Sequence, residues 1–162
     1  MTLATDQNVD RHGISPTGLQ FISIRDAVMD RWEREVRARV DGAQNLLRPV
    51  LTNTLPAFFD NIAEALSPDH PRTQAASGNN SASVHGTERA RMTPFGPDQV
   101  VHEYQILRES IGVVAKGRVV LDDDHWRIID ASINAAMREA VRSFTQIHED
   151  LRHKMAAALS HD

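Results

Sequence analysis

Apolar residues recur at helical spacing along four segments of the chain. In the first segment, residues 17–40, Ile24, Val28, Trp32 and Val36 follow one another every four positions, while charged residues take the intervening ones. Side chains three or four positions apart lie on one face of an α-helix. We therefore predict an amphipathic helix over this segment.

The second segment, residues 47–66, has a similar apolar stripe that is interrupted by two prolines. Asn53 or Thr54 is predicted to cap a helix that has Pro56 in its first turn, because proline is tolerated there and not in a helix interior. The residues before Asn53, with Pro49 among them, should form a separate short turn.

The third segment follows a stretch, residues 68–83, that is rich in Ser, Asn, Gly, Pro and Ala and is predicted to be a loop. It has two apolar pieces, residues 83–92 and 97–117, separated by Thr93-Pro94-Phe95-Gly96. Proline and glycine interrupt helices, so we predict one helix that is broken at this point.

The fourth segment begins after Asp122-Asp123-Asp124, whose carboxylates favour a helix N-terminus. Its apolar stripe continues from Trp126 to Leu159, and a helix of this length extends roughly 50 Å. The predicted fold is all-α: a four-helix bundle with a broken third helix and a long C-terminal helix that projects from the bundle.

Composition restricts the function. The 162 residues are 41% hydrophobic and 25% charged with a net charge of −4, so nothing favours binding to nucleic acid or an anionic membrane. There is no cysteine, and neither a signal peptide nor a long apolar span is recognisable, which favours a cytoplasmic protein.

The chain shows no recognisable catalytic or cofactor motif. It has no glycine-flanked nucleophile and no phosphate-binding loop, so no enzymatic activity and no cofactor are expected. The eight histidines include no Glu-x-x-His pair, and no dedicated metal site is predicted. If a metal or haem were bound, His85 and His102 would be the better-placed ligands.

Polar residues of the third segment lie beside its apolar stripe. His85 and Arg89 share one helical face, as do Tyr104 and Arg108, and Glu103 lies one position away from the stripe. Such groups are costly to bury without partners. They either form a structural network, in which Glu103 pairs with Arg89 or Arg108, or line the polar end of a small-molecule pocket; we favour the network.

Two motifs carry a resemblance to a known family. His85-Gly86-x-x-Arg89-Ala90, followed by Gln99-Val100-Val101-x-Glu103-Tyr104-x-x-Leu107-Arg108-x-x-Ile111, resembles the signature of the RsbRD-type N-terminal domain. This domain occurs in stressosome co-antagonists and at the front of bacterial sensor histidine kinases. The resemblance covers about residues 21–147 and implies a helical sensory domain, without implying a particular ligand.

The C-terminus resembles the start of a histidine-kinase phospho-acceptor box. Ser160-His161-Asp162 follows an amphipathic helix, and on this interpretation His161 is the phospho-acceptor in a longer protein. The predicted organisation is a disordered tail (1–16), a helical sensory bundle (17–147) and a signalling helix (148–162) that leads into a dimerisation and phospho-acceptor region.

Three functions remain open at this stage. The first is an input domain of a cytosolic histidine kinase, which dimerises through its C-terminal helix, serves a response regulator and receives a small-molecule or protein signal. The second is a stressosome-type scaffold, and the third is a metal- or haem-binding bundle. Blank elemental analysis and a blank absorption spectrum of the purified protein would eliminate the third.

Overall fold

The computed structural model describes residues 13–69 and 79–160, with residues 79 and 80 described only in their backbone. Every regular element in these two ranges is a helix, and no strand is present in them. The prediction of an all-helical fold is confirmed to this extent. The helices are α1 (Pro16–Ser23), α2 (Arg25–Arg39), α3 (Arg48–Thr52), α4 (Leu55–Ala65), α5 (Asn79–Met92), α6 (Pro97–Ala115) and α7 (Asp123–Ser160).

The first helix begins inside the segment predicted as a disordered tail. The Ser15 hydroxyl accepts a hydrogen bond from the backbone N–H of Gly18 at 3.0 Å, which satisfies one free donor of the first turn. The same hydroxyl donates to the carbonyl of Leu66 at 3.1 Å, and Ile14 is buried. The predicted tail is therefore too long, because Ile14 and Ser15 anchor α1 against the end of α4; residues 1–12 lie outside the described ranges.

The second segment divides as predicted. Pro56 lies in the first turn of α4, Thr54 is its N-cap residue, and the five-residue α3 precedes it. Asn53 joins the two helices with φ +32° and ψ −110°, a positive-φ conformation that residues other than glycine rarely adopt. This conformation turns the chain between α3 and α4 and directs the Asn53 side chain toward α5.

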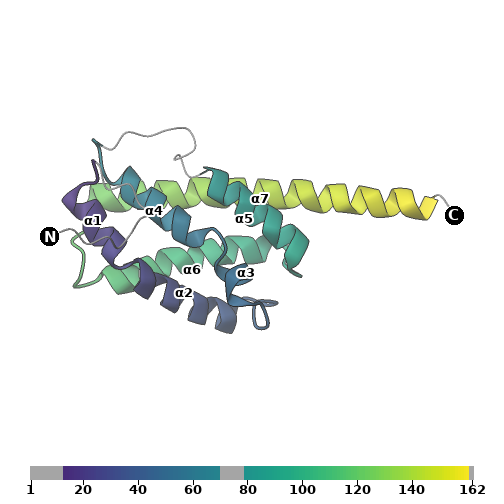
Figure 1. Cartoon of the computed structure of the whole chain (residues 1–162), viewed down its shortest axis with the longest axis horizontal. Helices are drawn as coiled ribbons and strands as arrows, with labels where there is room; N and C mark the ends of the chain where they lie inside the picture. Colours follow the sequence, from purple (N-terminus) through teal and green to yellow (C-terminus); the bar gives the residue numbers. More distant parts are fainter. Residues whose placement is uncertain (1–12, 70–78, 161–162) are drawn as a thin grey trace.

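The third segment differs from the prediction of one broken helix. Arg89 of α5 contacts Glu103 of α6 at 2.8 Å, although 14 residues of continuous helix would separate them by about 21 Å. The chain instead reverses between the two helices, which run in opposite directions (Figure 1), and both pack against α7. In addition, α5 begins at Asn79 rather than near residue 83, because its polar first turn carries no apolar signal.

The long C-terminal helix is confirmed. It spans 38 residues, about 57 Å at 1.5 Å per residue. Its core-facing side chains end at Phe144, and every residue from 148 to 160 is exposed. Figure 1 shows this final part extending beyond the rest of the molecule.

The core lies where the helices pack in pairs: α5 and α6 against α7, α2 against α6, and α1 against α4. Trp32 is fully buried in α2 and donates from its indole N–H to the carbonyl of Glu103 at 2.9 Å. Phe21 and Phe59 stack with ring centroids 4.1 Å apart, and Phe144 closes the core on α7. The predicted core positions Trp32 and Phe144 are confirmed.

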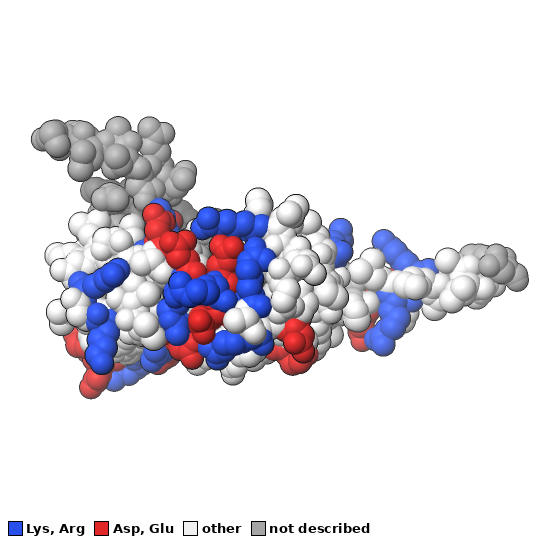
Figure 2. Space-filling model, turned by 90° about the horizontal axis from the view of Figure 1, so that it is seen from below, with Lys and Arg blue, Asp and Glu red and all other residues white. Residues whose placement is uncertain are grey.

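Ion pairs cover the outside of α2 and α6. Glu109 accepts from Arg39 at 2.6 Å and from Arg31 at 3.1 Å, which joins the two helices. Figure 2 shows basic and acidic side chains interspersed over the face seen from below. No helix in the described ranges combines the length and the apolar character needed to cross a membrane.

Candidate functional site

The buried polar triad consists of His85 and Arg89 on α5 and Glu103 on α6. The side chains of all three are completely buried. The spacing of four positions places His85 and Arg89 on one face of α5, and the reversal between α5 and α6 brings Glu103 opposite both. The sequence pattern predicted this association, and the structure shows its geometry.

Arg89 connects three helices. Its Nε donates to Glu103 Oε1 at 2.9 Å and its Nη2 to Glu103 Oε2 at 2.8 Å, the bidentate geometry that makes such pairs strong. Its remaining donors reach α3: Nη1 donates to the carbonyl of Val50 at 2.9 Å and Nη2 to that of Leu51 at 2.5 Å. Arg89 therefore satisfies carbonyls at the end of α3 that have no partner within the helix.

His85 is held between two acceptors. Its Nε2 lies 3.0 Å from Glu103 Oε1, and its Nδ1 lies 2.8 Å from Asn53 Oδ1. The Asn53 amide nitrogen donates to Glu88 Oε2 at 2.9 Å, which leaves the amide oxygen to face the imidazole. Both partners of the ring, Glu103 Oε1 and Asn53 Oδ1, are acceptors, so each ring nitrogen faces an oxygen to which an N–H can donate.

The triad controls the ionisation of Glu103. Burial raises the pKa of this carboxyl, but the nearby charges and hydrogen bonds of His85 and Arg89 outweigh burial, so the pKa lies below its ordinary value. The carboxylate therefore stays ionised at neutral pH, held by the Arg89 guanidinium and the His85 ring. Truncating Glu103 would leave both His85 and Arg89 buried without their shared acceptor.

Tyr104 borders the triad without joining its hydrogen bonds. Its ring packs edge-on against the rings of His85 and Phe58, with ring centroids 5.4 Å and 5.9 Å apart. Its hydroxyl is buried and has no hydrogen-bond partner among the described residues. Burial and the neighbouring Glu103 carboxylate both raise the pKa of Tyr104, so the phenol remains neutral.

Arg108 does not belong to the cluster, which corrects the prediction. It lies five positions after Glu103, about 140° further around the helix, and so points to another face of α6. There it pairs with Asp130 of α7 at 2.5 Å, and its guanidinium lies 4.0 Å from the centre of the Trp126 ring. It links α6 to the first turns of α7.

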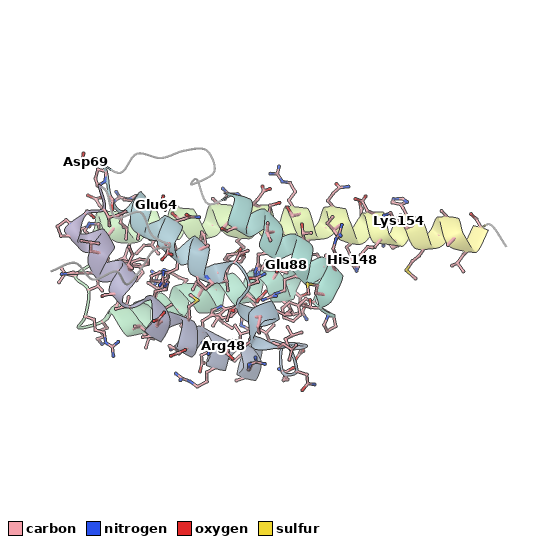
Figure 3. All side chains as sticks on the ribbon, viewed as in Figure 1. Arg48, Glu64, Asp69, Glu88, His148 and Lys154 are labelled. Carbon is pink, nitrogen blue, oxygen red and sulfur yellow. The ribbon has the colours of Figure 1, made fainter. Side chains whose placement is uncertain are left out.

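Sequence reasoning missed Asn53 and Glu88 as members of the network. The sequence pattern predicts Asn53 only as a candidate helix cap and gives Glu88 no role. Asn53 bonds to His85 and Glu88, which are 32 and 35 positions away in the sequence. Local sequence patterns do not predict contacts between residues so far apart. Figure 3 shows Glu88 on α5, above α3 and Arg48.

The described residues contain no group of three or more His, Asp or Glu side chains placed to hold a metal ion. Both ring nitrogens of His85 are engaged in hydrogen bonds. The packing of the triad, with each member buried and hydrogen-bonded, favours its interpretation as a structural network rather than a pocket wall.

The second feature of interest is the exposed apolar face of α7. Leu151, Met155 and Leu159 recur every four residues, and their exposed fractions are 39%, 67% and 73%. His148 and Lys154 extend from the same part of the helix (Figure 3), and His148 stacks on Phe144 at 5.5 Å between ring centroids. The apolar face of the core is thus continued by residues that have no covering element in the described ranges.

His161, the expected phospho-acceptor, lies outside the described residues. Comparison with protein-family models, with curated proteins and with solved structures finds no match to this chain.

Proposed function

We propose that this chain is the sensory input domain of a cytosolic bacterial histidine kinase, and that it passes its signal through α7. One observation carries the proposal: α7 continues past the core while keeping an apolar face of Leu151, Met155 and Leu159. Exposed leucine and methionine at helical spacing favour pairing with another helix. The resemblance of residues 85–111 to RsbRD-type domains gives this pairing its signalling context.

In this proposal residues 17–147 act as one sensory bundle of four-helix type. Helices α1 and α2 supply the first of its four helical segments, α3 and α4 the second, α5 and α6 the third, and α7 the fourth. The part of α7 from residue 148 to residue 160 forms the signalling helix, and two copies of the chain pair in parallel along it. A change in packing around α7 then becomes a rotation or a shift of register in the paired helices.

The contact between α5 and α7 supports such coupling. Gly86 lies against the backbone of Ala140, and it is the direct neighbour of His85 in the buried polar triad. The Ser83 and Ser143 hydroxyls are 3.0 Å apart across the same interface. A displacement of α5 would therefore push directly on α7, because the two helices are in contact.

Pairing is tested by sedimentation equilibrium on the wild type and on the double variant Leu151→Ser, Met155→Ser. The wild type should form a dimer, and the variant should be monomeric at the same concentration with an unchanged far-UV spectrum. Val113→Ser removes a half-exposed apolar side chain from α6 and serves as the control, which should still dimerise. A monomeric wild type contradicts the proposal, and assemblies larger than a dimer favour the stressosome-type scaffold.

Coupling is tested in a chain joined to a histidine-kinase catalytic core. Inserting two residues after Leu151 rotates everything downstream by about 200°. We expect autophosphorylation to change severalfold, whereas an insertion of seven residues, which restores the face, should return it toward the parental rate. Equal rates in all three proteins would exclude signalling through the helix.

A further inference from the structure

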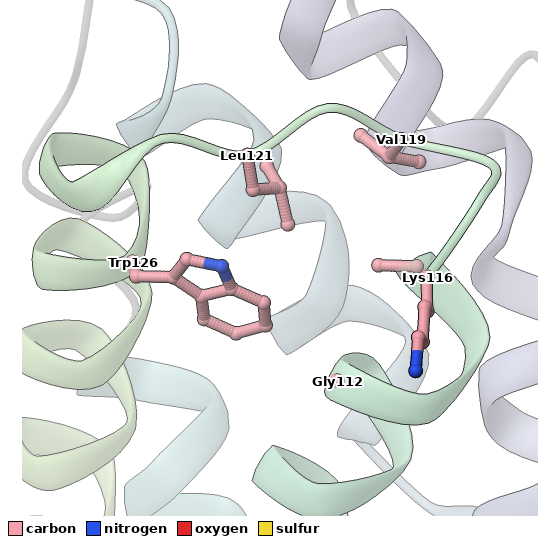
Figure 4. Close-up of a pocket in the computed structure, with 6 residues that line it drawn as sticks. Gly112, Lys116, Val119, Leu121 and Trp126 are labelled. Carbon is pink, nitrogen blue, oxygen red and sulfur yellow. The ribbon is translucent and has the colours of Figure 1, made fainter.

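A pocket lies where α6 ends and α7 begins. This junction pocket has a volume of about 280 Å³ and is lined by Gly112, Ala115, Lys116, Val119, Leu121 and Trp126. Figure 4 shows the Trp126 indole and the Leu121 side chain on one side of the space and the end of α6 on the other. The size is close to the lower end of small-molecule sites, which begin at about 300 Å³.

Gly112 has no structural reason to be glycine. It lies inside α6 with an ordinary helical backbone, where glycine destabilises a helix by roughly 0.5–1 kcal/mol relative to alanine. A Cβ at this position would meet only Arg108 Nη1 at 3.4 Å and the Trp126 ring at 4.0 Å, both ordinary contacts. What a side chain here would remove is free space in the junction pocket.

The residues that line the pocket are apolar except for Lys116. Ala115 and Val119 are buried, and Leu121 and Trp126 are partly buried against the core. Arg108, which lies over the Trp126 ring, already has Asp130 as its ionic partner. Lys116 is exposed at the rim and forms no ion pair with any described residue.

We infer that the junction pocket binds a small aromatic carboxylic acid. The ring packs against the Trp126 indole, Leu121 and Val119, and the carboxylate pairs with the Lys116 ammonium. An indole offers a flat apolar surface that favours aromatic partners, and a carboxylate is the natural counter-ion of an unpaired ammonium. Binding requires only this pocket, whereas its use as a signal rests on the proposed function.

The location gives the ligand a route to α7. Trp126 lies in the first turn of that helix, and Leu121 precedes it in the connecting loop. An aromatic ring bound between Trp126 and α6 would contact the first turn of α7. It would also lie near the Arg108–Asp130 ion pair that links the two helices. The ligand therefore acts on the N-terminal end of the signalling helix.

Binding is tested with benzoate and indole-3-carboxylate as probes and with benzamide, which lacks the charge, as the comparison. In two-dimensional NMR spectra the indole N–H signal of Trp126 should shift with the acids, whereas that of the buried Trp32 should stay in place. Calorimetry should give dissociation constants for the acids at least tenfold below that of benzamide, equivalent to about 1.4 kcal/mol.

Three variants locate the site. Lys116→Gln should weaken binding of the acids about tenfold, a difference of about 1.4 kcal/mol. Arg118→Gln removes a neighbouring cation that does not line the pocket and should bind as the wild type does. Gly112→Leu should abolish binding by filling the space, with its fold checked by the unchanged Trp32 signal.

The inference is overturned if neither acid shifts the Trp126 signal at millimolar concentration, or if Lys116→Gln and Arg118→Gln bind equally well. Sedimentation of the same samples separates this inference from the proposed function. If the protein is a dimer but binds neither acid, the ligand inference alone is wrong. If it binds an acid but is a monomer, the proposed signalling function alone is wrong.

Discussion

Gly86 of α5 lies directly against the carbonyl of Ala140 in α7. A Cβ built on Gly86 would be 2.0 Å from the Ala140 oxygen and 2.8 Å from its carbonyl carbon, distances that no side chain can occupy. Gly86 also lies in a row of small residues with Ala82 and Ala90, one every four positions along α5. The close approach of α5 to α7 therefore depends on the absence of a single methyl group.

Gly86→Ala should destabilise the protein, although alanine is the better helix former. The methyl group would force α5 away from α7, and overpacking of this kind costs about 1–3 kcal/mol. Gly112→Ala is the matched control, because its methyl group has room and should stabilise the helix by up to about 1 kcal/mol. Urea unfolding of both variants measures the two effects, and equal shifts in the same direction would contradict this account of the α5–α7 contact.

Arg89→Met should be among the most damaging single substitutions. It removes the bidentate partner of the Glu103 carboxylate, which keeps only His85, and leaves the carbonyls of Val50 and Leu51 without their donor; breaking a buried pair costs about 3–5 kcal/mol. The double variant Arg89→Met, Glu103→Leu should recover only part of this loss, since it removes the buried carboxylate but also takes the acceptor away from His85 Nε2. Double-mutant analysis of chemical unfolding measures the coupling, and simple additivity would show that the pair is not coupled.

Stability should decrease in acid because of Glu103. Its pKa is lower in the folded state than the ordinary value, so its stabilisation is complete above the unfolded pKa of about 4.3 and is lost as the pH falls through the folded pKa. Glu103→Gln, which carries no charge at any pH, should be less stable than the wild type at neutral pH. The gap in unfolding free energy between the two should narrow as the pH falls below about 4.3, whereas a gap independent of pH would show that the charge contributes nothing.

Tyr104→Phe should leave stability unchanged or increase it. The hydroxyl is buried without a partner among the described residues, and an unsatisfied buried polar group costs about 1–3 kcal/mol. Phenylalanine keeps the edge-on contacts with His85 and Phe58 while removing the unsatisfied group. A thermal melt that shows clear destabilisation would mean that the hydroxyl has a partner in solution.

The sequence predicted those parts of the fold that depend on local periodicity. Val28, Trp32 and Val36 form the buried face of α2, and the stripe that leads to Phe144 marks the buried part of α7. The break at Asn53 also followed from local chemistry, because Pro56 can begin a helix but cannot continue one. In each case neighbouring residues decide the structure.

The direction in which the chain continues after residues 93–96 could not be predicted from local sequence patterns. Periodicity shows which face of each piece is apolar, but it is the same whether α6 continues α5 or folds back on it. The fold-back decides the candidate site, because it places Glu103 beside Arg89 and turns Arg108 toward Asp130. The membership of Asn53 depends in addition on its positive-φ backbone conformation, which no local sequence pattern predicts.

The hydrogen bonds from Arg89 to α3 carry a consequence for the order of assembly. A helix of five residues is too short to persist by itself in water, because its nucleation is unfavourable. Its last carbonyls are satisfied by a guanidinium 38 and 39 positions away, which is in place only after the α5–α6 hairpin has closed. Helix α3 should therefore be among the last elements to form during folding, and its amide protons should exchange with solvent whenever that hairpin opens.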